Sequence, residues 1–188
     1  MKIFAQLLAF ILVIFISIQM SAQQPSNFDK SWKEIESLKK QGLPQSALKV
    51  VDKIYQQAKA ENNQPQLIKA LIYKISLQGD FEEDHKEKDI GLLMNDIKAS
   101  KTPEKEIMHS LLGELIFNYY NQNQWRVLQR TTTIGPSSSD IQTWDAVQFE
   151  DAIRTHYQLS LENQQELETI PLSDYQPILI EEKAVNLW

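Results

Sequence analysis

The amino-acid sequence predicts an all-α protein of antiparallel helical hairpins, followed by an extended C-terminal tail. Apolar residues recur at steps of three and four in one stretch after another, which places them on one face of a helix. Glycine, proline and asparagine separate these stretches at short intervals, and short connections force neighbouring helices to run antiparallel. The chain has no β-sandwich pattern. We therefore expect helices that pack apolar face against apolar face.

The first hairpin is predicted over residues 26–60. Ser26 and Asp29 resemble a capping box at the start of its first helix. Gly42-Leu43-Pro44 ends that helix and begins the second, because glycine tolerates positive φ and proline fits the first helical turn. The apolar face of the first helix comprises Phe28, Trp32, Ile35 and Leu38. The apolar face of the second comprises Ala47, Val51, Ile54, Tyr55 and Ala58.

Two more helices are predicted before residue 100. Pro65 opens a third helix that runs to Leu77, with apolar residues on more than one side, so we expect it to be heavily buried. Gly79 ends it, and Asp80 to Lys88 forms a charged connector. The fourth helix is marked by Ile90, Leu93, Met94 and Ile97.

The fifth predicted helix carries more apolar bulk than any other segment after residue 22, so we expect it at the centre of the core. Thr102 is its expected N-cap, Pro103 its first residue, and it runs to about Asn121. Its apolar residues are Ile107, Met108, Leu111, Leu112, Leu115, Ile116, Phe117, Tyr119 and Tyr120.

The composition of residues 130–140 predicts a loop. Thr143 is then expected to cap a sixth helix, and Pro171 and Pro177 prevent another long one. The apolar face of the sixth helix is expected to comprise Val147, Phe149, Ile153, Tyr157 and Leu161.

One stretch has the spacing of a tetratricopeptide repeat. Gly42 and Ala47 stand five apart, and Trp32 lies close to the repeat's Trp position. The later helices lack this signature. We therefore expect hairpins in a TPR-like or bundle arrangement, without a true repeat array.

The sequence is expected to divide into an N-terminal signal peptide, a helical domain and a C-terminal tail. Lys2, the apolar run Ile3 to Met20 and the small pair Ser21-Ala22 predict that residues 1–22 are a signal peptide cleaved after Ala22. The alternative is an uncleaved membrane anchor, because the run approaches the roughly 18 apolar residues that span a bilayer. Residues 23–166 are the expected helical domain. Residues 167–188 are the expected extended tail, or a linker to a following domain.

Composition narrows the functional classes. The chain has no cysteine, which excludes disulfides, thiol chemistry and a lipoprotein anchor at the signal, and so disfavours a glycan-capture lipoprotein. Its net charge of −6, without a basic cluster, argues against a nucleic-acid partner. With the signal removed, no further run is long enough to cross a membrane. We expect export to the periplasm, cell envelope or extracellular space.

No residue is predicted to be catalytic, cofactor-binding or metal-binding. The histidines His85, His109 and His156 lack the spacing typical of metal ligands. The acidic run Glu82 to Asp84 is interpreted as solvated charge, and Ser137 to Ser139 as a turn. No nucleotide-binding glycine motif occurs, so we expect no enzyme and no cofactor. Five aromatic residues are interpreted as core, with a peptide or glycan groove as the alternative: Tyr119, Tyr120, Trp125, Trp144 and Tyr157.

Several short stretches, in order and spacing, resemble the N-terminal region of bacterial alpha-2-macroglobulin-like exported proteins. The N-terminal matches are Phe28-Asp29-Lys30, Trp32-Lys33, Leu38, Gly42-Leu43-Pro44, Ser46-Ala47-Leu48, Val51-Asp52-Lys53-Ile54-Tyr55, Ala58-Lys59, Glu61-Asn62-Asn63, Pro65-Gln66 and Ile68-Lys69-Ala70. The downstream matches are Trp125-Arg126, Arg130-Thr131, Asp140-Ile141, Thr143-Trp144-Asp145, Ile170-Pro171, Asp174-Tyr175 and Pro177-Ile178-Leu179.

This resemblance implies that the chain is a fragment: the helical scaffold module of an exported endopeptidase inhibitor, whose protease partners would contact other regions of the longer protein. The family's Cys-Gln thioester and β-sandwich macroglobulin domains have no counterpart here, so no functional residue carries over. The alternative is a free-standing periplasmic, helical-repeat-like module that binds a peptide or an envelope protein.

Overall fold

The computed structural model describes residues 28–79, 85–131 and 140–179, and within them every regular element is helical. The all-α prediction is confirmed. The α-helices are α2 (Phe28–Lys40), α3 (Pro44–Ala60), α4 (Gln64–Gln78), α5 (His85–Ala99), α6 (Glu104–Val127), α7 (Ala146–Leu159) and α8 (Gln164–Leu167). The 3-10 helices are η1 (Ile141–Thr143) and η2 (Leu172–Ile178).

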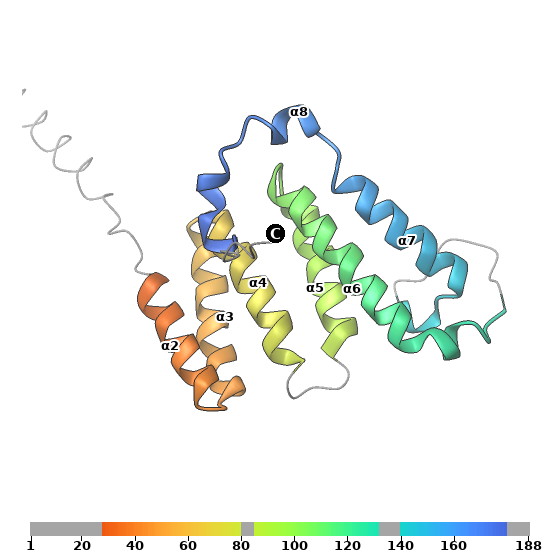
Figure 1. Ribbon diagram of the computed structural model, residues 1–188, viewed down its shortest axis with the longest axis horizontal. Helices are drawn as coiled ribbons and strands as arrows, with labels where there is room; N and C mark the ends of the chain where they lie inside the picture. The colour runs from red at the N-terminus through yellow and green to blue at the C-terminus, as the bar shows by residue number, and fades with distance from the viewer. Residues whose placement is uncertain (1–27, 80–84, 132–139, 180–188) are drawn as a thin grey trace, which may run out of the picture.

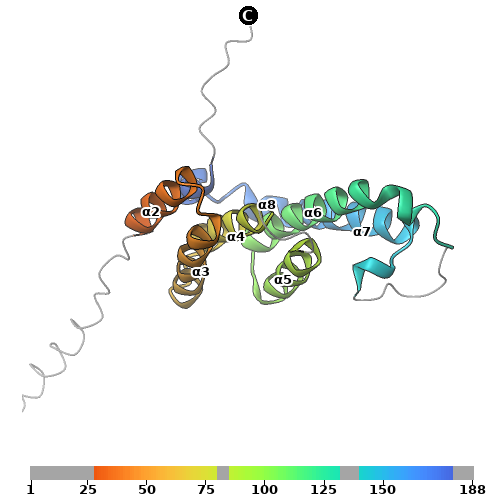
Figure 2. The same ribbon diagram turned by 90° about the horizontal axis from the view of Figure 1, so that it is seen from below.

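The long helices form a row of three hairpins, α2–α3, α4–α5 and α6–α7 (Figure 1). Consecutive helices from α2 to α7 contact one another along this row, and α3 with α4 make the most extensive contact, followed by α6 with α7. Figure 2 shows α3 and α5 on one side of the layer that contains α2, α4 and α6. Within the described residues, no helix has the length and apolar character needed to span a membrane.

The first hairpin matches its prediction closely. Gly42 has φ +70°, the left-handed conformation that glycine adopts easily, and Pro44 is the first residue of α3. All five apolar residues expected on α3 are buried, as are Phe28, Trp32 and Ile35 of α2. The capping box predicted at Ser26 lies outside the described residues.

Helix α6 contacts α4, α5 and α7, in agreement with its expected central place. Tyr119 and Tyr120 lie against Phe149 of α7, with ring centroids 5.9 and 5.3 Å apart. The helix continues past Asn121 to Val127, and Phe117 is 43% exposed rather than buried.

Three predicted helix starts are wrong. Pro103 is the N-cap of α6 rather than its first residue, and the Thr102 side chain does not cap it but donates to Glu106 Oε1 at 3.1 Å. Asp145 caps α7 in place of Thr143, because its carboxylate accepts from the Gln148 N–H at 2.9 Å and completes a capping box. Helix α5 begins at His85, inside the expected connector, whose residues 80–84 lie outside the described part.

The predicted apolar face of α7 is also wrong in part. Phe149 is its one fully buried residue, whereas Val147 is 50% exposed and Leu161, beyond the helix end, is 75% exposed. The residues packed partly against the core are Ala146, Ala152 and Ile153. Because α7 packs mainly on one helix, α6, it needs only a narrow apolar stripe.

The predicted tail contains short helical turns. From α8 the chain crosses back over the ends of the hairpins and places η2 against α4 (Figure 1). Tyr175 of η2 is buried, and its hydroxyl donates to Glu104 Oε1 of α6 at 2.9 Å. Residues 180–188 lie outside the described part. The segment from α8 to η2 therefore ties the last hairpin to the first two.

Candidate functional site

Two aromatic rings form the floor of a groove between α2 and α4, which we call the α2–α4 groove. Trp32 of α2 and Tyr73 of α4 have ring centroids 4.9 Å apart at an interplanar angle of 57°. Trp32 Nε1–H donates to Gln66 Oε1 at 2.7 Å, and the Tyr73 hydroxyl donates to Glu36 Oε1 at 3.0 Å. Each ring is thus held by a hydrogen bond to the opposite helix.

Lysine ammonium groups lie over these rings. Lys69 Nζ is 4.5 Å from the Trp32 ring centroid and 5.9 Å from that of Tyr73, and Lys39 Nζ is 4.9 Å from that of Tyr73. All three distances are within the range in which a cation is attracted to the face of an aromatic ring. Lys33 and Lys40 also line the groove and are exposed. The result is a basic groove with an aromatic floor.

Helical spacing brings these side chains together. Lys69 and Tyr73 are four residues apart on α4, and Trp32 is followed on α2 by Glu36, Lys39 and Lys40 at steps of four, seven and eight. Residues at these intervals share one helix face. The two faces then meet because α2 and α4 both pack against α3.

The groove consists of two adjoining cavities that share Lys69 and Tyr73. The first has a volume of about 400 Å³, and its walls come from α2 and α4. The second has a volume of about 430 Å³ and extends to η2. Its other lining residues are Lys39, Ile72, Ser76, Pro177, Ile178 and Leu179. One half of the groove is therefore basic and aromatic, and the other half is largely apolar.

Burial shifts the pKa values of two side chains in the groove, Lys69 and Tyr73. It lowers the pKa of Lys69, although the carboxylates of Glu36 and Asp29 act in the opposite direction. Burial, and then the hydrogen bond to Glu36, raises the pKa of the Tyr73 hydroxyl. Lys69 forms no ion pair or hydrogen bond with any residue that the structure describes. Its ammonium group is partly desolvated, and the nearby carboxylates of Glu36 and Asp29 form no ion pair with it.

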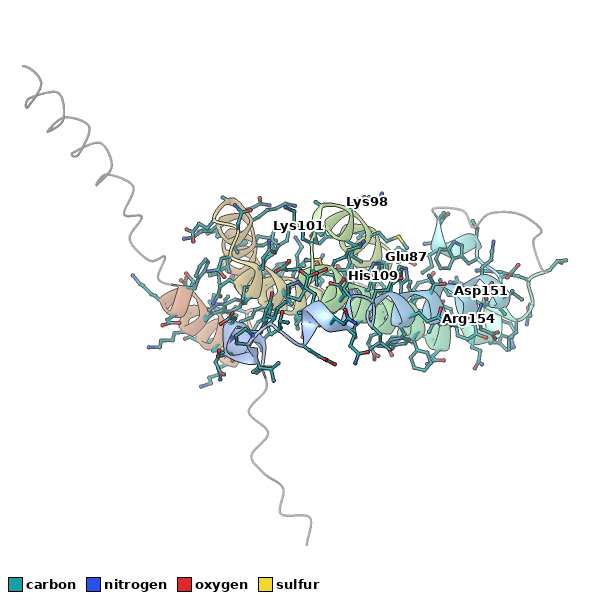
Figure 3. The ribbon with its side chains drawn as sticks, turned by 90° about the horizontal axis from the view of Figure 1, so that it is seen from above. Glu87, Lys98, Lys101, His109, Asp151 and Arg154 are labelled. Atoms are coloured by element: carbon teal, nitrogen blue, oxygen red, sulfur yellow. The ribbon has the colours of Figure 1, made fainter. Side chains whose placement is uncertain are left out.

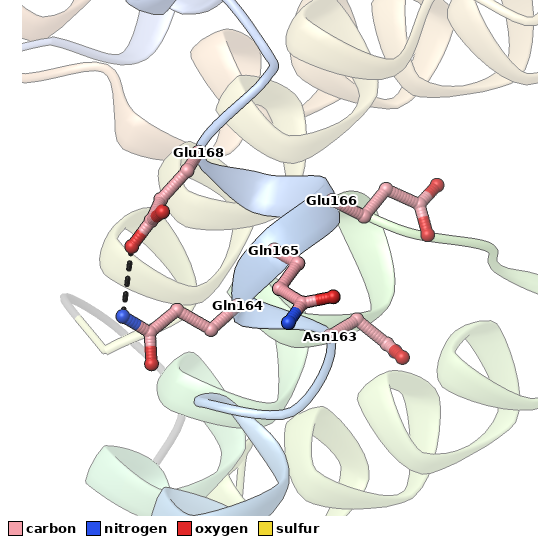
Figure 4. A pocket seen from close by; sticks show the side chains of 5 residues that line it. All are labelled: Asn163, Gln164, Gln165, Glu166 and Glu168. Atoms are coloured by element: carbon pink, nitrogen blue, oxygen red, sulfur yellow. Dashed lines mark hydrogen bonds between the residues drawn. The ribbon is translucent and has the colours of Figure 1, made fainter.

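A larger cavity lies elsewhere and is less suited to binding. It has a volume of about 660 Å³ and is lined by Asn163, Gln164, Gln165, Glu166 and Glu168. Figure 4 shows these side chains projecting from α8 and its flanking residues, with Gln164 Nε2 donating to Glu168 Oε1 at 2.8 Å. No second element and no apolar side chain contributes to its lining, so it is a polar surface around one short helix.

Two of the histidines form a pair that sequence reasoning missed. Nδ1 of His109 on α6, labelled in Figure 3, lies 2.9 Å from Nδ1 of His156 on α7, so one ring donates to the other. Burial, and then the neighbouring His109, lowers the pKa of His156 to about 4. Burial also lowers the pKa of His109. His85 instead lies 2.7 Å from Asp89 Oδ2. In the described ranges, no three His, Cys, Asp or Glu residues are arranged to hold a metal.

The five aromatic residues singled out from the sequence do not form a groove. Tyr119, Tyr120 and Trp144 are buried around Phe149, as the core interpretation predicts. The Tyr157 ring packs on Gly113, and Trp125 is 79% exposed. The acidic run Glu82 to Asp84 and the serines at 137–139 lie outside the described residues.

The sequence did contain a signal for the α2–α4 groove. Trp32 was assigned to a core face, yet three lysines lie one, seven and eight residues after it, and Lys69 precedes Tyr73 by one helical turn. Neither family models nor curated proteins nor solved structures give a match to this chain.

Proposed function

We propose that this chain is a non-catalytic helical docking module that holds an extended peptide segment in the α2–α4 groove. The observation that carries the proposal is the pair of rings, Trp32 and Tyr73, fixed from opposite helices beneath lysines and beside an apolar wall. The floor is formed before any partner arrives, so little ordering of the protein is needed on binding.

The dimensions of the groove favour a peptide over a compact ligand. Its two cavities, about 400 and 430 Å³, are each within the range of small-ligand sites but are open and adjoining. An extended peptide places alternate side chains on the same side, so that two of its residues enter the two halves. Ile72 and Leu179 supply apolar contact in one half of the groove. Lys69 lines both halves and supplies a positive charge where they meet.

We further propose that this module is the N-terminal scaffold of an exported protease inhibitor of the alpha-2-macroglobulin-like type. The support is the ordered set of sequence matches given above, which covers residues 28–179. Genomic DNA read past the codon for Trp188 tests the assignment. The expected result is an open frame that continues into macroglobulin domains, and an immediate stop codon would contradict it.

Docking is tested with a blocking variant. Ser76 lines the apolar half and is exposed, so Ser76→Trp fills the cavity without disturbing the core. Ser110→Trp, at an exposed position of α6 outside the groove, is the matched control. A phage-displayed random peptide library is selected on the mature chain, and the enriched peptides are measured by fluorescence anisotropy.

We expect Ser76→Trp to weaken peptide binding about tenfold or more, and Ser110→Trp to leave it unchanged. Failure to enrich any peptide would overturn the proposed function. So would peptides that bind Ser76→Trp as tightly as the parent protein.

A further inference from the structure

We infer that the α2–α4 groove selects acidic peptide segments in which a carboxylate stands next to an apolar side chain. This inference rests on the proposed docking function and specifies its partner. It is carried by the charge of the groove, the position of Lys69, and the apolar wall that adjoins them.

The groove is basic within an acidic chain. Its lining holds four lysines, Lys33, Lys39, Lys40 and Lys69, against the single carboxylate of Glu36, whereas the whole chain has a net charge of −6. Glu36 already accepts a hydrogen bond from Tyr73 and lies 3.6 Å from Lys39 Nζ. The remaining positive charge is available to a ligand, and complementary charge is what gives an interface its selectivity.

Lys69 is placed to bind a carboxylate. Its ammonium group lies 4.5 Å from the Trp32 ring centroid, at the junction of the two cavities. Burial removes part of the water around this group and lowers the pKa of Lys69. A carboxylate entering the groove would form a charge-assisted hydrogen bond with this group, which is stronger than one between neutral partners.

The apolar half explains why a peptide, rather than any polyanion, is expected. Ile72 and Leu179 are 36% and 43% exposed, and they line the second cavity with Ile178 and Pro177. Because Lys69 lines both cavities, an apolar side chain in the second would lie close to a carboxylate at Lys69. A nucleic acid would also meet the negative charge of the rest of the molecule.

The test compares two labelled peptides of the same length. The acidic probe is acetyl-Glu-Asp-Leu-Glu-Phe-Asp-Glu, and in the neutral probe Gln and Asn replace Glu and Asp. Fluorescence anisotropy with the mature chain is measured at about 50 mM and about 300 mM salt. We expect the acidic probe to bind about tenfold more tightly at low salt, and this advantage to shrink at high salt.

The variants assign the effect to the groove. Lys39→Gln/Lys69→Gln should reduce binding of the acidic probe to that of the neutral probe, and Lys69→Arg should retain most of it. The charge-matched control is Lys98→Gln/Lys101→Gln, whose positions lie on α5 and the turn after it, outside the groove lining (Figure 3). This control should bind as the parent does.

Four results would overturn the inference. Equal binding of both probes would remove the acidic preference but leave docking intact, whereas loss of all peptide binding, including the library peptides, would remove the docking function itself. If a labelled oligothymidylate bound as tightly as the acidic probe, the groove would be selecting negative charge alone. Binding that appears only after Glu181→Gln/Glu182→Gln would show that the chain's own acidic segment is the occupant.

Discussion

The buried carboxylate of Asp96 finds its hydrogen-bond partners on another helix. Asp96 of α5 is buried and accepts from the Tyr55 hydroxyl at 2.6 Å and from Lys59 Nζ at 2.9 Å, both on α3. Burial, reinforced by Asp96, raises the pKa of Tyr55 to about 12. A buried carboxylate is tolerated when hydrogen bonds replace its water, and here those bonds also fix α3 against α5.

The histidine pair makes stability depend on pH. The pKa of His156 is about 4 in the folded protein, below the value of about 6.5 expected when unfolded, so the unfolded chain binds more protons between these values. Stability is therefore full above about pH 6.5 and falls as the pH drops toward 4. Between about pH 7 and pH 5 we expect a loss on the order of 1 kcal/mol, since His156 is partly exposed.

Urea denaturation at several pH values measures this dependence. His156→Asn keeps a polar group for His109 but removes one titrating ring, so the slope between about pH 7 and pH 5 should become shallower. Lys105, Glu106 and Glu162 also influence His109 and remain in the variant. An unchanged slope would show that the pair does not control the pH response.

The N-cap of α7 is Asp145 in the structure, whereas the sequence predicted Thr143. Asp145 accepts from the Gln148 N–H at 2.9 Å, whereas the Thr143 hydroxyl donates to the Asp140 carbonyl at 2.7 Å. Asp145→Ala should lower the free energy of unfolding by about 0.5–2 kcal/mol, and Thr143→Ala should cost less. Chemical denaturation checks both, and a larger loss for Thr143→Ala would contradict the assigned cap.

Among the helices, η2 connects the end of the described chain to two earlier helices, α4 and α6. It packs against α4, and through Tyr175 it reaches Glu104 at the start of α6. It also forms one wall of the α2–α4 groove. The groove is therefore complete only when this segment is in place.

Removing one hydroxyl tests that attachment. Tyr175→Phe leaves Glu104, which is buried, without this donor, and we expect a loss of about 1–3 kcal/mol in the free energy of unfolding. Tyr157→Phe, which removes an exposed hydrogen bond to Glu114, is the matched control and should cost less. Equal small losses, measured by urea denaturation, would show that η2 is not held through Tyr175.

The helices were predictable where local rules decide them. The α3 face and the turn at Gly42 follow from periodicity and backbone preference, and both are confirmed. The caps of α6 and α7 were misplaced, because each start offers more than one suitable residue close together. The histidine pair spans 47 residues, and the Trp32–Tyr73 floor joins two hairpins. Such contacts depend on how hairpins stack, which periodicity does not specify.

The whole molecule is a row of hairpins in which α2, α4 and α6 share a layer. This arrangement holds α2 and α4 apart at the backbone while their side chains meet at the groove floor. The same layer receives η2 on α4, so the chain itself shows that this face accepts a short, irregular segment. A docked peptide would extend a contact that the fold already makes.

The central claim is that the α2–α4 groove is the docking surface, and nuclear magnetic resonance tests it most directly. The acidic probe is titrated into the ¹⁵N-labelled chain while the amide and indole N–H signals are followed. We predict that the Trp32 indole signal and the amides of Lys69, Tyr73 and Ile178 shift together, while the exposed Trp125 indole stays in place. Shifts centred on Trp125 and α6, with Trp32 unchanged, would contradict the account.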